Sequence, residues 1–305
     1  MIYTVTFNPS IDYMIETAEF TTGRVNRAGF EQFFWGGKGI NVSTVLNGLR
    51  LKTIALGFIA GFTGKAIEAG LRSNGIKTDF IELSEGLSRI NVKIQSDEET
   101  EINGYGPDIT WDDVDKLYEK LDALKAGDTL VLAGSVPRNL PDNIYGLILE
   151  RVSGKRIRTV VDAEKKLLLG ALSAKPFLVK PNIHELGDLF GVEVKGEDDA
   201  AHYAKKLKEM GAVNVLVSMG ADGAILLDEN GELHKCEASS HSNAISTVGA
   251  GDSMVAGFIA GLTEKDGDYE YALKYGTAAG CATALSNGLA KSTDICAELM
   301  ALGIL

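Results

Sequence analysis

The most chemically suggestive segment of the chain is TVGAGDS, residues 247–253, which comes directly before the apolar run MVAGFIAGL. The apolar run predicts a helix, and the first backbone N–H groups of a helix are unpaired and attract anions. Small residues at Gly249, Ala250 and Gly251 would let a phosphoryl group approach that backbone closely. Asp252, in the first turn, could then take the proton of a hydroxyl group that attacks phosphorus. The same residues would also suit an ordinary helix start with a capping acid.

A second glycine-rich segment, WGGKGIN, covers residues 35–41 and also comes before an expected helix. Gly36 and Gly37 would permit the close approach of a ligand. Lys38 offers a point charge for a phosphate, and the amide of Asn41 could donate to and accept from a sugar hydroxyl. A solvent-exposed glycine loop with a solvated lysine is the alternative interpretation.

Two further candidate segments each follow an expected strand. Asp12 lies in NPSID (residues 8–12) and could bind a sugar hydroxyl, because ligands of open α/β sheets bind at the carboxyl ends of strands. In KPNIHE (residues 180–185), Asn182 and Glu185 lie one helical turn apart and could hold Mg²⁺ through water, since Mg²⁺ keeps several waters in proteins. The alternatives are an Asx-type turn for the first segment and a capped helix start for the second.

Several isolated residues complete the candidate set. Arginine side chains match the geometry of phosphate, and Arg27 and Arg89 lie in polar segments, where solvated surface arginines are the alternative. Ser135 follows another expected strand and could contact a ligand or merely lie in a turn. The loop SMGADG (residues 218–223) could pass near a nucleotide or simply join two strands as a hairpin. Asn287, on a late helix, is uninformative by itself.

The elements that must position these residues alternate along the chain. Short apolar, β-branched runs predict buried strands, and the runs between them predict helices, which together favour an α/β fold with a mainly parallel sheet covered on both faces. The expected strands are 2–7, 53–59, 129–134, 158–163, 177–182 and 214–220. The expected helices are 38–50, 64–74, 111–124, 141–153, 185–190, 197–210, 250–262, 268–286 and 292–302.

Two segments interrupt this alternation, at about residues 11–34 and 88–104. RAGFEQFF, RINVKIQ and ETEING alternate polar and apolar residues, which is typical of strands with one wet and one dry face. We expect these segments to form a small β-sheet lid inserted in a single α/β domain of residues 1–305. The dry face of such a sheet needs cover, so a homodimer through the lid is expected.

Composition narrows the possible partners. The 305 residues carry 30 Lys and Arg against 42 Asp and Glu, a formal charge of −12, which disfavours binding to nucleic acid or to an anionic membrane. No run of about 18 apolar residues predicts a transmembrane helix. The three cysteines have neither zinc nor disulfide spacing, which predicts a cytoplasmic protein. The P-loop, the G-x-G-x-x-G dinucleotide fingerprint and the G-x-S-x-G hydrolase motif are missing, which weakens the NAD-dependent oxidoreductase and hydrolase alternatives.

The motifs NPSID, GGKGIN, RINVK, PNIHE and VGAGDS follow one another from end to end of the chain. In this combination the sequence resembles the ribokinase-like (PfkB) family of carbohydrate kinases, and within it the branch that acts on hexose phosphates. The resemblance implies a ribokinase-like three-layer α/β/α fold and an enzyme that phosphorylates a sugar hydroxyl with ATP and Mg²⁺. It also implies that Asp252 is the catalytic base, that residues 249–251 hold the transferring phosphoryl group, and that Asn182 and Glu185 position Mg²⁺ through water.

The resemblance divides the candidates between two substrates, a small sugar phosphate and ATP. For the sugar phosphate it implies Asp12, Gly36, Gly37, Lys38, Asn41, Arg89, Arg27 and Ser135, with Lys38 and Arg89 as the main phosphate ligands. For ATP it implies Lys180, Asn182, Glu185, Ser218, Gly220, Gly223 and Asn287. The favoured reaction is the conversion of fructose 1-phosphate to fructose 1,6-bisphosphate. Tagatose 6-phosphate as substrate is the nearest alternative, and a sugar-phosphate-binding regulator without turnover is an alternative of another class.

Overall fold

The structure is a computed structural model that describes residues 1–239 and 244–304. Its centre is a ten-stranded sheet in the order β14-β13-β12-β11-β10-β9-β1-β4-β5, with β6 paired to β4. The parallel strands are β1 (Ile2–Thr6), β4 (Thr53–Ala60), β5 (Lys77–Thr78), β6 (Ile81–Leu83), β9 (Thr129–Ala133), β10 (Arg158–Asp162), β11 (Leu178–Val179) and β12 (Asn214–Ser218). At one edge, β13 (Ala224–Leu227) and β14 (Leu233–Cys236) continue the sheet in antiparallel fashion.

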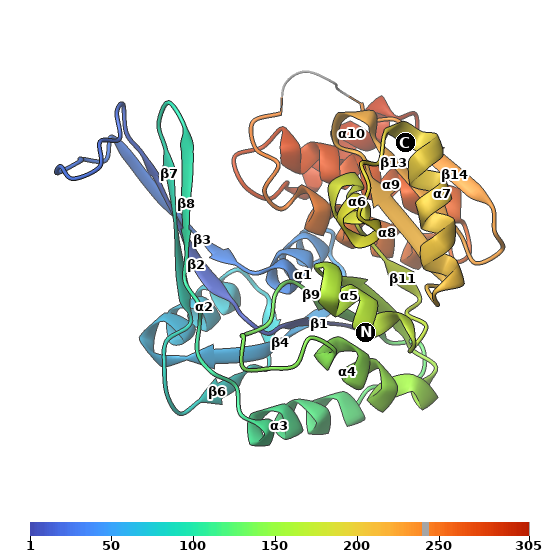
Figure 1. Cartoon of the computed structure of the whole chain (residues 1–305), viewed down its shortest axis with the longest axis horizontal. Helices are drawn as coiled ribbons and strands as arrows, with labels where there is room; N and C mark the ends of the chain where they lie inside the picture. Colours follow the sequence, from blue (N-terminus) through green and yellow to red (C-terminus); the bar gives the residue numbers. More distant parts are fainter. Residues whose placement is uncertain (240–243, 305) are drawn as a thin grey trace.

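Helices cover both faces of this sheet (Figure 1). Leu130 and Leu132 of β9 point into one core and Val131 into the other, and all three are fully buried, which explains the continuous apolar runs of these strands. None of the described helices is long and apolar enough to cross a membrane. The helices on one face are α3 (Trp111–Asp122), α4 (Ile144–Val152), α5 (Lys165–Leu172), α6 (Ile183–Phe190) and α7 (Gly196–Glu209). The helices on the other face are α1 (Lys38–Gly48), α8 (Ala250–Glu264), α9 (Tyr269–Ala284) and α10 (Ser292–Ala301). Helix α2 (Gly61–Ser73) packs on β4 and on the second, smaller sheet described below.

The three-layer α/β/α architecture expected from the sequence is confirmed. Local differences include the short strands β5, β6, β13 and β14, which lie outside the expected strands. The strand expected at residues 177–182 ends at Val179, because Pro181 has no N–H group and Asn182 already caps α6. Helix α5 is absent from the expected helices. Its N-cap residue, Glu164, forms no side-chain cap hydrogen bond, so the sequence carries no start signal there.

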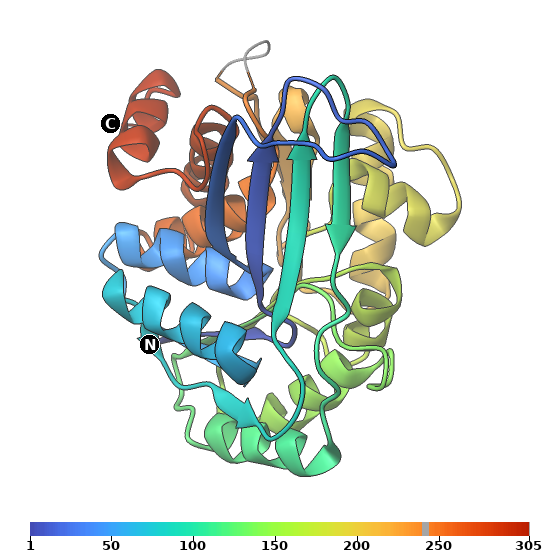
Figure 2. The same cartoon turned by 90° about the vertical axis from the view of Figure 1, so that its left-hand side faces the viewer.

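A separate four-stranded sheet, in the order β3-β2-β7-β8, stands beside the main body, edge-on in Figure 1 and face-on in Figure 2. In this small sheet β2 and β7 are parallel, and each forms an antiparallel pair with its other neighbour. The two interrupting segments therefore do form one small sheet, as predicted. Its strands are β2 (Ser10–Glu16), β3 (Phe30–Gly36), β7 (Arg89–Gln95) and β8 (Glu99–Asn103).

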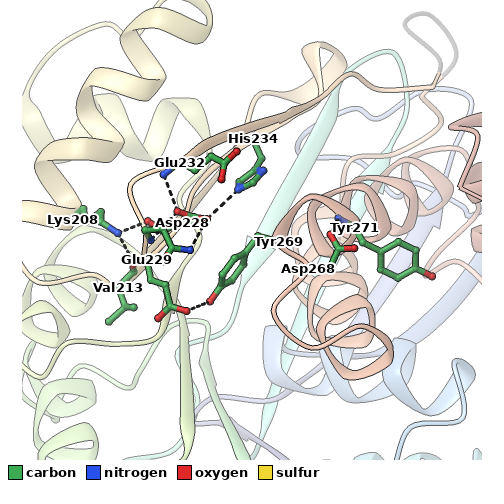
Figure 3. A network of polar contacts seen from close by, with 10 residues as sticks. Lys208, Val213, Asp228, Glu229, Glu232, His234, Asp268, Tyr269 and Tyr271 are labelled. Atoms are coloured by element: carbon green, nitrogen blue, oxygen red, sulfur yellow. Dashed lines mark hydrogen bonds and ion pairs between the residues drawn. The ribbon is translucent and has the colours of Figure 1, made fainter.

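A polar cluster fixes the β13–β14 hairpin (Figure 3). Asp228 accepts hydrogen bonds from the backbone N–H groups of Asn230 and Glu232 at 2.9 and 2.8 Å, and its Oδ2 lies 3.1 Å from His234 Nε2. Lys208 donates a hydrogen bond to the carbonyl oxygen of Asp228. Within the described residues, Asp228, Glu232 and His234 are the one group of three with metal-ligand spacing. Because the Asp228 carboxylate is already occupied by the turn, the cluster is explained as the closure of the hairpin.

Candidate active site

Two cavities lie at the edge of the main sheet where its parallel strands end, which is where open α/β sheets bind ligands. Each has a volume of about 570 Å³. The first cavity lies among the ends of β10, β11 and β12 and the start of α8, and its lining includes Lys38, Asp162, Lys180, Glu185 and Asp252. The second cavity lies between the small sheet and the start of α8, and its lining includes Asp12, Gly36, Asn41, Lys93 and Gly249.

Asp252 lies in the first turn of α8, where the two cavities meet, and its side chain is buried. Gly249, the N-cap of this helix, has a φ of 79°, in the left-handed region that favours glycine. Asn41 Nδ2 donates a hydrogen bond of 2.7 Å to Asp252 Oδ2. Since Asn41 lines the second cavity and Asp252 the first, this hydrogen bond joins the two spaces. The carboxylate that faces the first cavity is therefore linked through Asn41 to the wall of the second cavity.

The surroundings of Asp252 raise its pKa to about 7. Burial is the main cause, because it disfavours the charged carboxylate, and the negative charge of Asp162 acts in the same direction. The charges of Lys38 and Lys180 and the hydrogen bond from Asn41 lower the pKa but do not outweigh these effects. A carboxylate with a pKa near neutrality is well suited to accept a proton as a general base.

Asp162, the last residue of β10, binds two lysine side chains at the wall of the first cavity. Its Oδ1 lies 3.1 Å from Lys38 Nζ and 3.4 Å from Lys180 Nζ, and the side chains of Asp162 and Lys180 are only 1% and 3% exposed. Burial alone would raise the pKa of Asp162, but the charges of Lys180 and Lys38 outweigh it and the pKa is lowered. Asp162 is therefore ionised and fixes both ammonium groups.

The start of α8 and these lysines form an anion-binding wall. A Cβ atom on Gly251 would lie 3.0 Å from Lys180 Nζ, so the ammonium group lies directly beside the bare backbone of the helix start. The unpaired N–H groups and the dipole of the helix add positive potential at the same place. A phosphate group in the first cavity would thus be stabilised by the helix start together with Lys38 and Lys180.

Asp12 is fixed on the small sheet at the wall of the second cavity. Ser10 Oγ and Asn91 Nδ2 donate hydrogen bonds to Asp12 Oδ1 at 2.7 and 2.8 Å. A Cβ atom on Gly36 would lie only 2.2 Å from Asp12 Oδ2, so glycine is required there to make room for the carboxylate. A carboxylate held in this way can accept a hydrogen bond from a sugar hydroxyl.

Comparison with known proteins identifies the class of protein that has this site. Residues 5–296 match the pfkB family of carbohydrate kinases. The chain belongs to the PfkB family. The 1-phosphofructokinase of Bacillus subtilis is 44% identical and the D-tagatose-1-phosphate kinase of Bacillus licheniformis 39% identical, each over 95% of this chain and 94% of the relative. The crystal structure of phosphofructokinase-2 from Escherichia coli in complex with fructose-6-phosphate is 27% identical, with a TM-score of 0.90 and 99% of both chains covered.

The protein is therefore a PfkB carbohydrate kinase with the ribokinase-like fold, and the expectation from the sequence is confirmed at this level. A PfkB kinase is a phosphotransferase with an alcohol group as acceptor, and ATP is its co-substrate. Such a reaction needs two substrates, and the described structure has two adjacent cavities of similar volume.

Most of the residues expected to bind ATP in this PfkB kinase meet in the first cavity. Asn182 and Glu185 also cap helix α6 reciprocally: Glu185 N donates to Asn182 Oδ1 at 2.7 Å, and Asn182 N donates to Glu185 Oε2 at 2.8 Å. Asn287 differs from the expectation, because it lines the second cavity. The segment after α9 turns toward the small sheet there, where a Cβ atom on Gly288 would lie 3.0 Å from Phe34. The first cavity is lined by the expected ATP-binding residues Lys180, Asn182, Glu185, Ser218, Gly220 and Gly223 and by the expected catalytic residues Gly249, Ala250, Gly251 and Asp252.

The residues expected to bind the sugar phosphate are divided by the structure. Asp12, Gly36 and Asn41 line the second cavity, as expected. Lys38 lines the first cavity, where its Nζ donates a hydrogen bond of 3.1 Å to the buried carboxylate of Asp162. Gly37 has a φ of 121° and serves as the N-cap of α1.

The three remaining sugar-side candidates are not among the described residues that line either cavity. Arg89 donates hydrogen bonds from Nε and Nη2 to the backbone carbonyl of Asn8 at 3.0 and 2.6 Å. Arg27 lies in the exposed connection between β2 and β3, and Ser135 follows β9. Their contacts with the substrate remain predictions.

Reasoning from the sequence missed Asp162, Ser10, Asn91 and Lys93. A carboxylate at the carboxyl end of an expected strand was a usable signal for Asp162, since RTVVDA ends at the edge where ligands bind. The alternation in RINVKIQ was a signal for the others, because it places Asn91 and Lys93 on one face of their strand. Ser10 carried no signal beyond its nearness to Asp12.

Proposed function

We propose that this PfkB kinase transfers the γ-phosphoryl group of ATP to the 6-hydroxyl group of fructose 1-phosphate and so forms fructose 1,6-bisphosphate. The observation that carries the proposal is the 2.7 Å hydrogen bond between Asn41 and Asp252, which connects the cavity for the sugar phosphate with the cavity for ATP. The choice of sugar phosphate is supported by the 44% identity with the 1-phosphofructokinase of Bacillus subtilis.

In the proposed reaction, Asp252 takes the proton of the 6-hydroxyl group while the hydroxyl oxygen forms a bond to the γ-phosphorus. The bond from this phosphorus to the oxygen shared with the β-phosphate breaks, and ADP leaves with that electron pair. The start of α8 at residues 249–251, together with Lys38 and Lys180, stabilises the negative charge on the transferred group. The burial of Asp252 keeps bulk water away from the reacting oxygen.

The residues of the first cavity also fit Mg²⁺. Glu185 and Asn182 offer oxygen atoms, and Asp162 Oδ2 is buried with no hydrogen-bond partner within the described residues. Mg²⁺ prefers oxygen ligands and keeps several waters, so we propose that Glu185 and Asn182 hold it through water. When bound, Mg²⁺ would neutralise charge on the phosphates of ATP. The reciprocal cap between Asn182 and Glu185 keeps these donors in fixed positions.

Asp12 and Asn41 would orient the sugar ring, and Gly36 leaves the space that this requires. Arg89 remains a proposed contact to the sugar phosphate, supported by the interaction of its charge with Asp12. Arg27 and Ser135 are the weakest of the proposed contacts, since neither is a lining residue in the described structure.

A coupled assay of ADP release tests the proposal. Purified protein is given ATP, Mg²⁺ and, in parallel, fructose 1-phosphate, fructose 6-phosphate, tagatose 1-phosphate, tagatose 6-phosphate or no sugar. We expect the highest kcat/KM with fructose 1-phosphate. A higher kcat/KM with any other sugar would overturn the substrate, and ADP release that no sugar stimulates would favour a regulator without turnover.

Tagatose 1-phosphate is the second candidate substrate, supported by the 39% identity with the kinase of Bacillus licheniformis. It differs from fructose 1-phosphate only in the configuration at C4, so its 6-hydroxyl group would occupy the same place. The relatives from Bacillus licheniformis and Klebsiella oxytoca are named for D-tagatose 1-phosphate. Tagatose 6-phosphate, the alternative expected from the sequence, is therefore weaker.

The raised pKa of Asp252 predicts the pH dependence of the reaction. A protonated carboxylic acid cannot accept the hydroxyl proton, so kcat/KM for the sugar phosphate should rise with pH and level off above about 7. Below that value kcat/KM should fall about tenfold per pH unit. Initial rates from roughly pH 5.5 to 8.5 measure this acid limb, which reports the free enzyme. A flat profile would contradict the assignment of Asp252 as the base.

We also propose that residues 1–305 form one α/β domain and that the small sheet acts as its lid and as a dimer interface. Ile90 and Ile102 lie on the sheet face opposite Asp12 and are 44% and 60% exposed. An exposed apolar sheet face of this kind needs cover. Sedimentation equilibrium measures the mass, and a monomer at all concentrations would contradict the dimer. A cytoplasmic location is supported by the three free cysteines, which suit a reducing compartment.

A further inference from the structure

The second cavity contains one cationic side chain among its described lining residues, that of Lys93 on β7. The other ionisable lining residues, Asp12 and Glu99, are acidic. A sugar phosphate would bring close to two negative charges into this space. The cations expected to meet them lie elsewhere, since Lys38 binds Asp162 in the first cavity and Arg89 binds a backbone carbonyl.

Lys93 lies on the same face of the small sheet as Asp12. In the pairing of β2 with β7, Asp12 is opposite Asn91 and Met14 is opposite Lys93. Lys93 is therefore two residues, or about 6.6 Å of extended strand, farther along the sheet than the Asp12 pair. A ketohexose held at its ring by Asp12 can thus place a phosphate on C1 toward Lys93, while its C6 end extends toward Asn41.

The ammonium group of Lys93 is held in position by Glu101. The two residues are opposite each other in β7 and β8, and Lys93 Nζ lies 2.9 Å from Glu101 Oε1. The Lys93 side chain is 15% exposed and that of Glu101 is 39% exposed, so the lysine is the more buried partner. The hydrogen bond and charge of Lys93 lower the pKa of Glu101. A lysine ammonium has three donors, and a phosphate can therefore bind to Lys93 beside Glu101 or in its place.

We propose that Lys93 binds the phosphate group of the incoming sugar phosphate and determines the preference of this kinase for a phosphorylated over an unphosphorylated ketohexose. The inference rests on the proposed function and assigns Lys38 to the phosphoryl group that comes from ATP. Glu101 orients Lys93 before the substrate arrives.

The variant Lys93→Met tests this assignment with the coupled assay. We expect KM for fructose 1-phosphate to rise about 10- to 100-fold, the effect of losing one charge-assisted hydrogen bond. kcat should stay within about threefold, because the contact exists both before and during the reaction. KM for ATP and the rate with unphosphorylated fructose should not change, so the preference for the phosphorylated sugar falls by the same factor as KM rises. Lys93→Arg should keep most of the preference.

Two further variants serve as matched comparisons. Lys65→Met removes a surface lysine on α2 whose Nζ lies 3.1 Å from Glu82, and we expect wild-type kinetics. Glu101→Gln weakens the contact that orients Lys93 but keeps an oxygen that can accept its hydrogen bond, so it should raise KM for fructose 1-phosphate by less than Lys93→Met does. A Lys93→Met enzyme whose KM for fructose 1-phosphate stays within about twofold of wild type would overturn the inference. So would an equal loss of activity toward fructose and fructose 1-phosphate, which indicates a structural role.

The outcome also separates this inference from the proposed substrate. If the wild-type enzyme prefers another ketohexose phosphate, the proposed substrate fails, and Lys93→Met is then measured on the preferred one. A selective rise in KM for that phosphorylated sugar would still support the role of Lys93. An unchanged KM would overturn it.

Discussion

Replacing Asp252 with asparagine is expected to lower kcat for fructose 1-phosphate by about 10²- to 10⁴-fold, the usual loss when a general base is removed. Asparagine has nearly the size of aspartate, and its side-chain oxygen can still accept the hydrogen bond that Asn41 donates. The site should therefore keep its shape, while the hydroxyl proton has no acceptor. KM for both substrates should change little, because Asp252 contributes mainly to the transition state. Steady-state kinetics with the coupled assay measures both constants.

Glu264→Gln is the matched control for this variant. Glu264 is an exposed acid at the other end of the same helix, so the control makes the same change of charge far from the cavities. It should retain wild-type kcat. The acid limb of the pH profile should be present in the control and absent from Asp252→Asn. A kcat of Asp252→Asn within about tenfold of wild type would show that another group accepts the proton.

Replacing Asp162 with asparagine is expected to lower the free energy of unfolding by about 3–5 kcal/mol, the cost of removing one partner from a buried ion pair. The side chain of Lys180 is 3% exposed, so its ammonium group would lose its anionic partner with little solvent to replace it. Lys38 would lose the same partner, although its side chain is 33% exposed and can turn toward solvent. Urea unfolding at pH 7 measures the difference from wild type.

Asp142→Asn is the matched control, because it removes one partner of an ion pair on the protein surface. Asp142 pairs with Lys166 at 2.9 Å, and their side chains are 65% and 75% exposed, so its loss should cost less than about 1 kcal/mol. Equal effects of the two substitutions would contradict the structural role of Asp162. The pKa of Asp162 is lowered in the folded protein, so its stabilisation is complete above the pKa of the unfolded chain and disappears as the pH falls through the folded value. The difference between wild type and Asp162→Asn should therefore close in acid.

The pH dependence of kcat/KM for Asp162→Asn tests whether the charge of Asp162 acts on Asp252. The pKa of Asp252 is raised first by burial and then by the charge of Asp162, so removing that charge should lower it. The acid limb of kcat/KM should then move to lower pH. An unchanged limb would show that Asp162 does not act on Asp252 electrostatically.

The sequence was sufficient to predict those parts of the site that depend on local backbone. The starts of α1 and α8 carry their own signals, because glycines followed by an apolar run predict an exposed helix N-terminus wherever the helix is located. The central parallel strands β1, β4, β9, β10, β11 and β12 were predicted because both faces of the sheet are covered and their sequences are therefore mainly apolar. The small sheet was predicted from its alternation of polar and apolar residues.

The sequence was insufficient where a side chain depends on a distant partner. Lys38 and Asp162 are 124 residues apart, and nothing near either residue indicates that they form an ion pair. The sequence prediction for Lys38 therefore relied on its neighbours in the glycine motif. These neighbours suggested that Lys38 faces the sugar phosphate rather than ATP. Helix α5 was missed because it begins without a side-chain cap. Its apolar face packs against the main core, so tertiary contacts stabilise it instead of a local signal.

The location of Asp12 and Lys93 on the small sheet, and of Asp252 on the main body, has a consequence for how this enzyme can change over evolution. Two stretches of chain, residues 10–36 and 89–103, carry most of the groups that we propose to face the sugar, and Asn41 on α1 is the exception. The phosphate-binding backbone and the proton acceptor come from other parts of the chain. New sugar preferences can therefore arise by mutation or exchange of these two stretches while the chemistry of transfer is inherited intact. If both stretches of this enzyme are replaced by those of a relative, the chimaera should acquire the sugar preference of the relative. Its rate of phosphoryl transfer should remain that of the present enzyme.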